Sequence, residues 1–189
     1  MTDVLLFHHA QGLTDGVNAF ADRLRQAGHR VTAPDLYDGH TYATLEQGMA
    51  HARGAGFQKL VDRGVAAADG LADDLVYVGL SLGVMPAQQL AQTRPGARGA
   101  VLCFACVPAE EFGGPWPVGV GLQVHGMDHD PVFADEGDLA AAQQLTESVD
   151  GAELFVYPGD QHLFVDSSLS DHRPEAAELL TARVLDFLA

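Results

Sequence analysis

A serine between two glycines stands where it could act as a nucleophile. The run Gly79-Leu80-Ser81-Leu82-Gly83 follows the apolar segment 75–78 and precedes a segment, 82–92, of helical composition. Glycines two residues on either side of a serine permit a tight strand-to-helix turn that exposes the hydroxyl. The helix behind such a turn offers N–H groups and its positive dipole end to a developing oxyanion. The pattern predicts acyl chemistry at Ser81, although the glycine spacing alone also arises by chance.

A serine hydroxyl is a weak nucleophile and needs a base beside it. Among the four histidines that follow Ser81, His162 lies between the last expected strand and the last expected helix, in a loop that ends at the carboxyl edge of the sheet. The acid that orients the imidazole is expected earlier, in the loop after the strand 121–125. Asp128 and Asp130 both qualify there. We favour Asp130.

The first apolar segment ends in His8-His9-Ala10-Gln11-Gly12. The equivalent loop commonly supplies one oxyanion N–H, so Ala10 and Leu82 are the expected backbone donors. His9, Gln11 and Asp128 are candidates for the pocket around the nucleophile. Metal binding by His8 and His9 is disfavoured, because neighbouring strand residues point apart and no other ligands have site-like spacing. We therefore expect neither a metal nor an organic cofactor.

The two cysteines, Cys103 and Cys106, lie in an apolar stretch. No second ligand pair accompanies them, so a zinc site is poorly supported. Their spacing on a strand would point the two side chains to opposite faces. We expect both to be buried structural thiols.

The composition limits the class of partner. The chain of 189 residues has 10 Lys+Arg against 26 Asp+Glu, a formal net charge of -16. Such a surface should repel nucleic acid and anionic membranes, but it does not identify a substrate. The expected partner, a small-molecule acyl substrate, follows from the motif around Ser81. The N-terminus lacks a positively charged leader and no apolar run reaches about 18 residues, so we expect a cytoplasmic protein with one domain over 1–189. The oligomeric state is left open.

Apolar runs alternate with helical spacing along the chain. Alternation of this kind predicts an α/β fold, with a mostly parallel sheet of about six strands covered by helices on both faces. The expected strands are 4–8, 31–33, 75–78, 100–104, 121–125 and 154–157. The expected helices are 17–27, 45–71 with breaks at Gly54 and Gly56, 82–92, 138–149 and 175–188.

With these residues in place, the chain resembles the dienelactone hydrolase family of α/β-hydrolases. The resemblance implies an α/β-hydrolase fold with a shortened sheet, whose first strand lies between the second and third. It also implies that Asp130 is the acid and His162 the base, and it places His9 where some members carry a glutamate that contacts the nucleophile. The matching stretches are Gly12-Leu13, Gly28-His29-Arg30-Val31, Ala33-Pro34-Asp35-Leu36-Tyr37, Gly79–Gly83, Asp130-Pro131-Val132 and Gln161-His162-Leu163-Phe164.

Two departures from that family narrow the expected substrate. Many members use a cysteine nucleophile, whereas this chain has Ser81, and no arginine follows His162 to bind a substrate carboxylate. The longest loop, 107–120, is short for a cap domain, which favours a small and accessible substrate. The expected activity is hydrolysis of a small ester or lactone through an acyl-enzyme. The alternatives are a thioesterase or acyltransferase with the same triad, a non-catalytic ligand-binding protein, and an α/β domain with an incidental glycine-serine turn.

Overall fold

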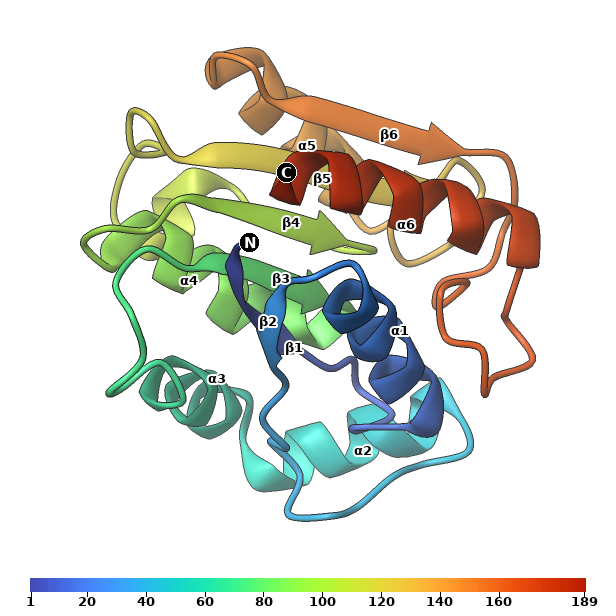
Figure 1. Cartoon of the computed structure of the whole chain (residues 1–189). Coiled ribbons are helices and arrows are strands. Elements are labelled where there is room, and N and C mark those ends of the chain that lie inside the picture. Colours follow the sequence, from blue (N-terminus) through green and yellow to red (C-terminus); the bar gives the residue numbers. More distant parts are fainter.

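The computed structural model describes residues 1–189, and a single six-stranded sheet runs through it (Figure 1). Every neighbouring pair of strands is parallel, in the order β2-β1-β3-β4-β5-β6. This confirms the expected parallel α/β architecture and the position of the first strand between the second and third. The strands are β1 (Asp3–Phe7), β2 (Arg30–Thr32), β3 (Val76–Leu80), β4 (Gly99–Cys103), β5 (Gly121–Met127) and β6 (Glu153–Tyr157).

Helices cover both faces of the sheet. In Figure 1, α1 (Asp15–Gln26) and α6 (Pro174–Leu188) lie on the near side and α4 (Val84–Thr93) on the far side. The helices α2 (Leu45–Ala55), α3 (Phe57–Ala66) and α5 (Asp138–Ser148) share the core of the α4 side. Two short 3-10 helices, η1 (Ser81–Gly83) and η2 (Ala109–Phe112), complete the set. No helix is long and apolar enough to cross a membrane.

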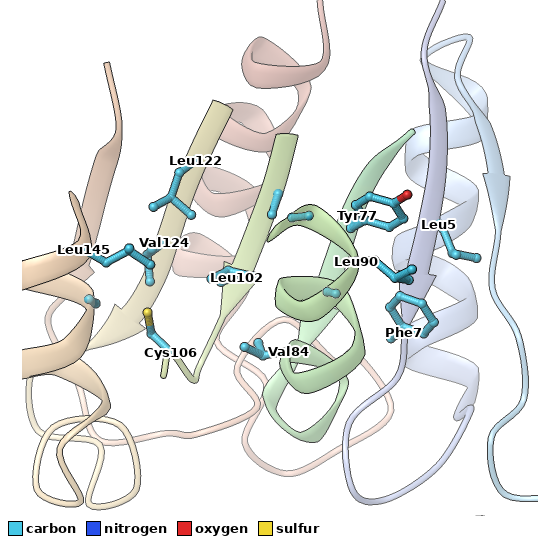
Figure 2. Close-up of a cluster of buried hydrophobic side chains, with 14 of the residues drawn as sticks. Leu5, Phe7, Tyr77, Val84, Leu90, Leu102, Cys106, Leu122, Val124 and Leu145 are labelled. Atoms are coloured by element: carbon cyan, nitrogen blue, oxygen red, sulfur yellow. The ribbon is translucent and has the colours of Figure 1, made fainter. Parts of the chain in front are cut away.

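Alternate residues of the central strands enter two separate cores. On β1, Leu5 and Phe7 join the cluster beneath α3 and α4, whereas Val4 and Leu6 join the cluster beneath α1 and α6. Figure 2 shows the first cluster, with Leu90 of α4 facing the strand residues. Since both faces are buried, the strands read as continuous apolar runs. Full burial of each large side chain contributes about 1.5–3 kcal/mol, so the sheet is a firm platform for its connecting loops.

The structure differs from the expected elements at several boundaries. The expected helix 45–71 is two helices that meet at Gly56, whose φ of 92° interrupts the helical backbone. Gly54, expected to be a second break, lies inside α2. The expected strand 75–78 begins one residue later and continues to Leu80, so β3 leads directly into Ser81.

The two cysteines are free and buried, as expected, but they do not share a strand. β4 ends at Cys103, and Cys106 lies in the following connection. They nevertheless belong to the two different cores, on opposite sides of the sheet. Burial raises the pKa of the Cys106 thiol to about 12, with a further contribution from Asp138, so this side chain is an apolar packing group.

Candidate active site

The turn at Ser81 is held in an uncommon backbone conformation by its two glycines. Ser81 has a φ of 51°, in the left-handed region that few non-glycine residues occupy. A Cβ on Gly79 would come within 2.6 Å of the Gly83 carbonyl oxygen, and a Cβ on Gly83 within 2.4 Å of the Phe7 carbonyl oxygen. Both glycines are therefore needed for β3, β1 and the following helix to approach so closely. The strained turn projects the Ser81 side chain at the carboxyl edge of the sheet.

Three side chains form a continuous hydrogen-bonded chain at this edge. Ser81 Oγ lies 2.8 Å from His162 Nε2, and His162 Nδ1 lies 2.7 Å from Asp130 Oδ2. The residues come from the connections that follow β3, β6 and β5, three parallel strands whose carboxyl ends share one edge. Because Asp130 accepts the Nδ1 proton, Nε2 is free to accept the proton of the serine hydroxyl.

Neighbouring groups hold these three hydrogen-bonded side chains in place. Asp130 is fully buried, and its other oxygen accepts the Val132 N–H at 2.9 Å. His162 is 5% exposed and packs against the Phe104 ring, with centroids 6.0 Å apart. Asp128, the other acid considered for this position, instead contacts His129 at 2.6 Å and the Gly159 N–H at 3.0 Å. The structure therefore brings Asp130, and not Asp128, to His162.

The two expected backbone donors, Ala10 and Leu82, follow the carboxyl ends of β1 and β3. Ala10 is buried, and its N–H has no hydrogen-bond acceptor in the protein, whereas the next N–H, of Gln11, donates to His9 Nδ1 at 3.2 Å. Leu82 is in the first turn of the helical segment after Ser81, where N–H groups lack intrahelical partners. Gly48 of α2 lies against Ala10, since a Cβ there would come within 2.0 Å of the Ala10 carbonyl oxygen. This contact holds the Ala10 loop in position.

A pocket of about 440 Å³ opens at Ser81 and His162. Its walls come from α2, α4 and the connections after β4 and β5, so several loops at one sheet edge build it together. Three carboxylates, Glu46, Glu136 and Asp138, also line it. A larger hollow of about 550 Å³ lies between the end of β6 and α6, but it contains neither Ser81 nor His162. The apolar wall of the Ser81 pocket consists of Leu45, Met49, Leu82, Met85, Ala105, Val107 and Val132.

The prediction that His9, Gln11 and Asp128 line the pocket is wrong, because none of the three is among its walls. His9 is fully buried and hydrogen-bonded to Asp166. The Gln11 side chain donates to the Tyr42 carbonyl oxygen at 3.0 Å, away from the serine. Asp128 is exposed beyond the end of β5, because its contacts with His129 and Gly159 turn it outward.

His9 belongs to a second buried histidine–aspartate pair. Its Nε2 lies 2.8 Å from Asp166 Oδ2, and the same carboxylate accepts hydrogen bonds from Thr14 Oγ1 and from the N–H and hydroxyl of Ser168. Burial alone would raise the pKa of Asp166, but the hydrogen bonds from His9, Ser168 and Thr14 outweigh it and lower the pKa to about 2. The pair ties the loop after β1 to the segment after His162.

Two further buried histidines are structural. His8 accepts the Leu36 N–H at Nε2, 3.0 Å away, and donates from Nδ1 to its neighbour's carbonyl oxygen. His125 lies between the Tyr157 hydroxyl and the Gln123 amide oxygen. Burial lowers the pKa of His8 to about 4 and that of His125 to about 3, so both are neutral near pH 7. Metal binding is not supported for His8 and His9, since no group of three or more candidate ligands exists.

The sequence reasoning missed Asp166 and most of the pocket. Asp166 had no recognisable signal, because an acid four residues after a loop histidine matches no diagnostic spacing. Glu136 and Asp138 gave a partial signal, since they lie between the loop after β5, which was expected to reach the site, and the first residue of α5. Glu46 gave none, because it reaches the pocket only through the packing of α2.

A parallel sheet with helices on both faces and a nucleophile turn after β3 defines an α/β-hydrolase fold. Solved structures share it over 99–100% of this chain. A promiscuous, dienelactone hydrolase-like phosphotriesterase from metagenomic libraries matches with a TM-score of 0.74 and 18% identity, over 85% of that protein. The pyrethroid hydrolase PytH matches with a TM-score of 0.62 and 17% identity, over 97% of that protein. A cold-adapted esterase from an Arctic intertidal metagenomic library matches with a TM-score of 0.63 and 17% identity, over 82% of that protein.

The model of the dienelactone hydrolase family matches residues 1–189. The chain belongs to this family and is, by that membership, a hydrolase acting on ester bonds. No curated protein sequence matches the chain. The family assignment therefore rests on the family model, and the structural likeness supports the fold.

Proposed function

We propose that the protein is a serine hydrolase in which Ser81, His162 and Asp130 form a catalytic triad that cleaves small esters or lactones. One observation carries the proposal: the hydrogen-bonded chain from Ser81 through His162 to Asp130 ends at the mouth of a pocket large enough for a small organic molecule. The acyl substrate is the expected partner, and neither a metal nor an organic cofactor takes part in the chemistry.

The first half-reaction forms an acyl-enzyme. As Ser81 Oγ attacks the ester carbonyl, its proton passes to His162 Nε2, and Asp130 stabilises the resulting imidazolium through Nδ1. The carbonyl oxygen becomes an oxyanion, which the N–H groups of Ala10 and Leu82 stabilise. The tetrahedral intermediate then expels the alcohol, which takes the proton from His162.

The second half-reaction repeats these steps with water. His162 removes a proton from the attacking water, and the second tetrahedral intermediate releases the carboxylic acid and restores Ser81. The strained backbone at Ser81 supports this role because it presents the hydroxyl to His162 at the pocket. A water supply from the open pocket favours hydrolysis over transfer of the acyl group to another acceptor.

The apolar wall of the pocket supports esters with hydrocarbon groups as substrates. The structural relatives named above are described as a phosphotriesterase, a pyrethroid hydrolase and an esterase, which is in keeping with ester hydrolysis on this fold. We also propose that the enzyme acts in the cytoplasm, which cell fractionation would test.

A fluorophosphonate probe tests the proposal, because it reacts covalently only with an activated serine. Mass spectrometry should find the label on Ser81 of the wild-type protein, and p-nitrophenyl butyrate should be hydrolysed. His162→Ala should lose both labelling and turnover, whereas His129→Ala, at an exposed histidine outside the pocket, should retain both. A wild-type protein that folds but is not labelled would contradict the proposed function and favour a non-catalytic ligand-binding role.

A further inference from the structure

The walls of the Ser81 pocket carry charge of only one sign. Glu46 enters from α2, Glu136 from the loop after β5, and Asp138 from the start of α5. No lysine or arginine lines the pocket. The carboxylates reach the pocket around Ser81 from two separate parts of the chain.

These carboxylates are not neutralised inside the protein. None of the three takes part in an ion pair, although the protein has several elsewhere. Glu46 and Glu136 also have no side-chain hydrogen-bond partner, and both are exposed to the pocket and solvent. Their charge is therefore available to a bound molecule.

Asp138 is the most enclosed of the three. Its Oδ1 accepts the Cys106 N–H at 2.7 Å, which fixes the carboxylate at the pocket wall. Burial raises the pKa of Asp138, the Cys106 hydrogen bond and the nearby His162 lower it, and the neighbouring Glu136 raises it. Asp138 thus lies within electrostatic range of both His162 and Glu136, which line the same pocket.

We propose that this pocket selects esters by charge, preferring amphipathic esters that carry a cationic group, such as a quaternary ammonium, and rejecting anionic ones. The inference rests on the proposed function, since it names the substrate class of the same site. The methionines Met49 and Met85 provide flexible apolar contacts for the hydrocarbon part, while Glu46 and Glu136 attract the cation. An anionic ester meets three carboxylates in a partly desolvated cavity, where repulsion is stronger than in bulk water.

Two series of isosteric esters test this selection. In the first, butyrylcholine is compared with 3,3-dimethylbutyl butyrate, in which carbon replaces the ammonium nitrogen. The third member is a butyrate ester whose alcohol ends in a carboxylate. In the second, the same three end groups are placed on the acyl side of p-nitrophenyl esters. We expect kcat/KM at low salt to be about tenfold higher for the cationic than for the neutral member of one series, with the anionic member lowest. The series in which this occurs shows which side of the ester faces the carboxylates.

A double variant, Glu46→Gln with Glu136→Gln, should abolish most of this preference, and high salt should reduce it in the wild type. The control is Asp69→Asn with Glu147→Gln, which changes the net charge equally at exposed positions outside the pocket and should leave the preference intact. Equal kcat/KM for cationic and neutral members in both series would overturn the inference while the hydrolase remains. So would a preference that survives in the pocket variant. Failure to hydrolyse any ester, with no labelling of Ser81, would instead overturn the proposed function and the inference with it.

Discussion

The molecule contains two buried histidine–aspartate pairs with almost the same geometry and different surroundings. His162 and Asp130 are 2.7 Å apart, and His9 and Asp166 are 2.8 Å apart. In the first pair the remaining imidazole nitrogen faces the Ser81 hydroxyl at the pocket. In the second it accepts the backbone N–H of Gln11, so both nitrogens of His9 are occupied within the fold.

The carboxylates differ in the same way. Asp130 makes one backbone hydrogen bond besides its contact with His162, whereas Asp166 accepts from His9, Thr14 and Ser168 together. A histidine whose second nitrogen contacts a serine hydroxyl at a pocket can take up the hydroxyl proton. A histidine whose second nitrogen accepts a backbone N–H can only hold two segments together. The two pairs therefore differ in what faces the second imidazole nitrogen, a serine hydroxyl at a pocket or a buried backbone N–H.

The largest expected effect comes from breaking the His162–Asp130 pair, which faces the pocket. Asp130→Asn should lower kcat for ester hydrolysis by roughly 10³–10⁴-fold, because an amide would hold His162 in the wrong tautomer. Steady-state kinetics on p-nitrophenyl butyrate measures it. Asp128→Asn is the matched control, and its kcat should stay within about twofold of wild type, since it does not contact His162. A severe loss in Asp128→Asn with a normal Asp130→Asn would reverse the assignment of the acid.

Breaking the His9–Asp166 pair should change the stability of the protein more than its rate of ester hydrolysis. Asp166→Asn should lower the free energy of unfolding by about 2–4 kcal/mol, since Thr14 and Ser168 lose an ionised acceptor, with kcat of the folded protein reduced less than about tenfold. Urea unfolding and kinetics on the same samples measure both quantities.

A glycine pair provides the matched control for this prediction. Gly16→Ala should act like Asp166→Asn, because its Cβ would overlap the Asp166 carboxylate. Gly54→Ala, at an open site inside α2, should stabilise the protein by up to about 1 kcal/mol. If Asp166→Asn instead left stability unchanged and abolished turnover, the His9–Asp166 pair would have to take part in catalysis.

A smaller effect on the free energy of unfolding should appear at acidic pH. The pKa of Asp166 is about 2 in the folded protein, below its ordinary value of 3.8, so the ionised group stabilises the fold above that ordinary value. As the pH falls from about 4 toward 2, a stabilisation of about 2 kcal/mol should be lost. The difference in unfolding free energy between wild type and Asp166→Asn should therefore shrink over this range. A difference that stays constant down to pH 2 would contradict the assigned role of the ionised carboxylate.

Much of the fold could be read from the sequence because its signals are local. Apolar runs and their order were enough to predict a parallel sheet and the positions of Ser81 and His162 at its carboxyl edge. The errors were at places where residue type leaves the backbone conformation open. Gly54 and Gly56 have the same residue type and lie two positions apart, yet only Gly56 ends a helix, since Gly54 stays within the hydrogen-bonded ladder of α2.

The sequence by itself determined the nucleophile turn, since Gly79 and Gly83 admit a conformation that side chains there would forbid. It also determined the order in which serine, acid and histidine follow the strands. Only the tertiary structure decided that His9 pairs with Asp166, that Asp130 reaches His162, and that Glu46 joins Glu136 and Asp138 at one pocket. The physical reason is distance along the chain: each of these contacts joins segments that meet only when the helices dock on the finished sheet, and no local spacing encodes which side chain then faces which.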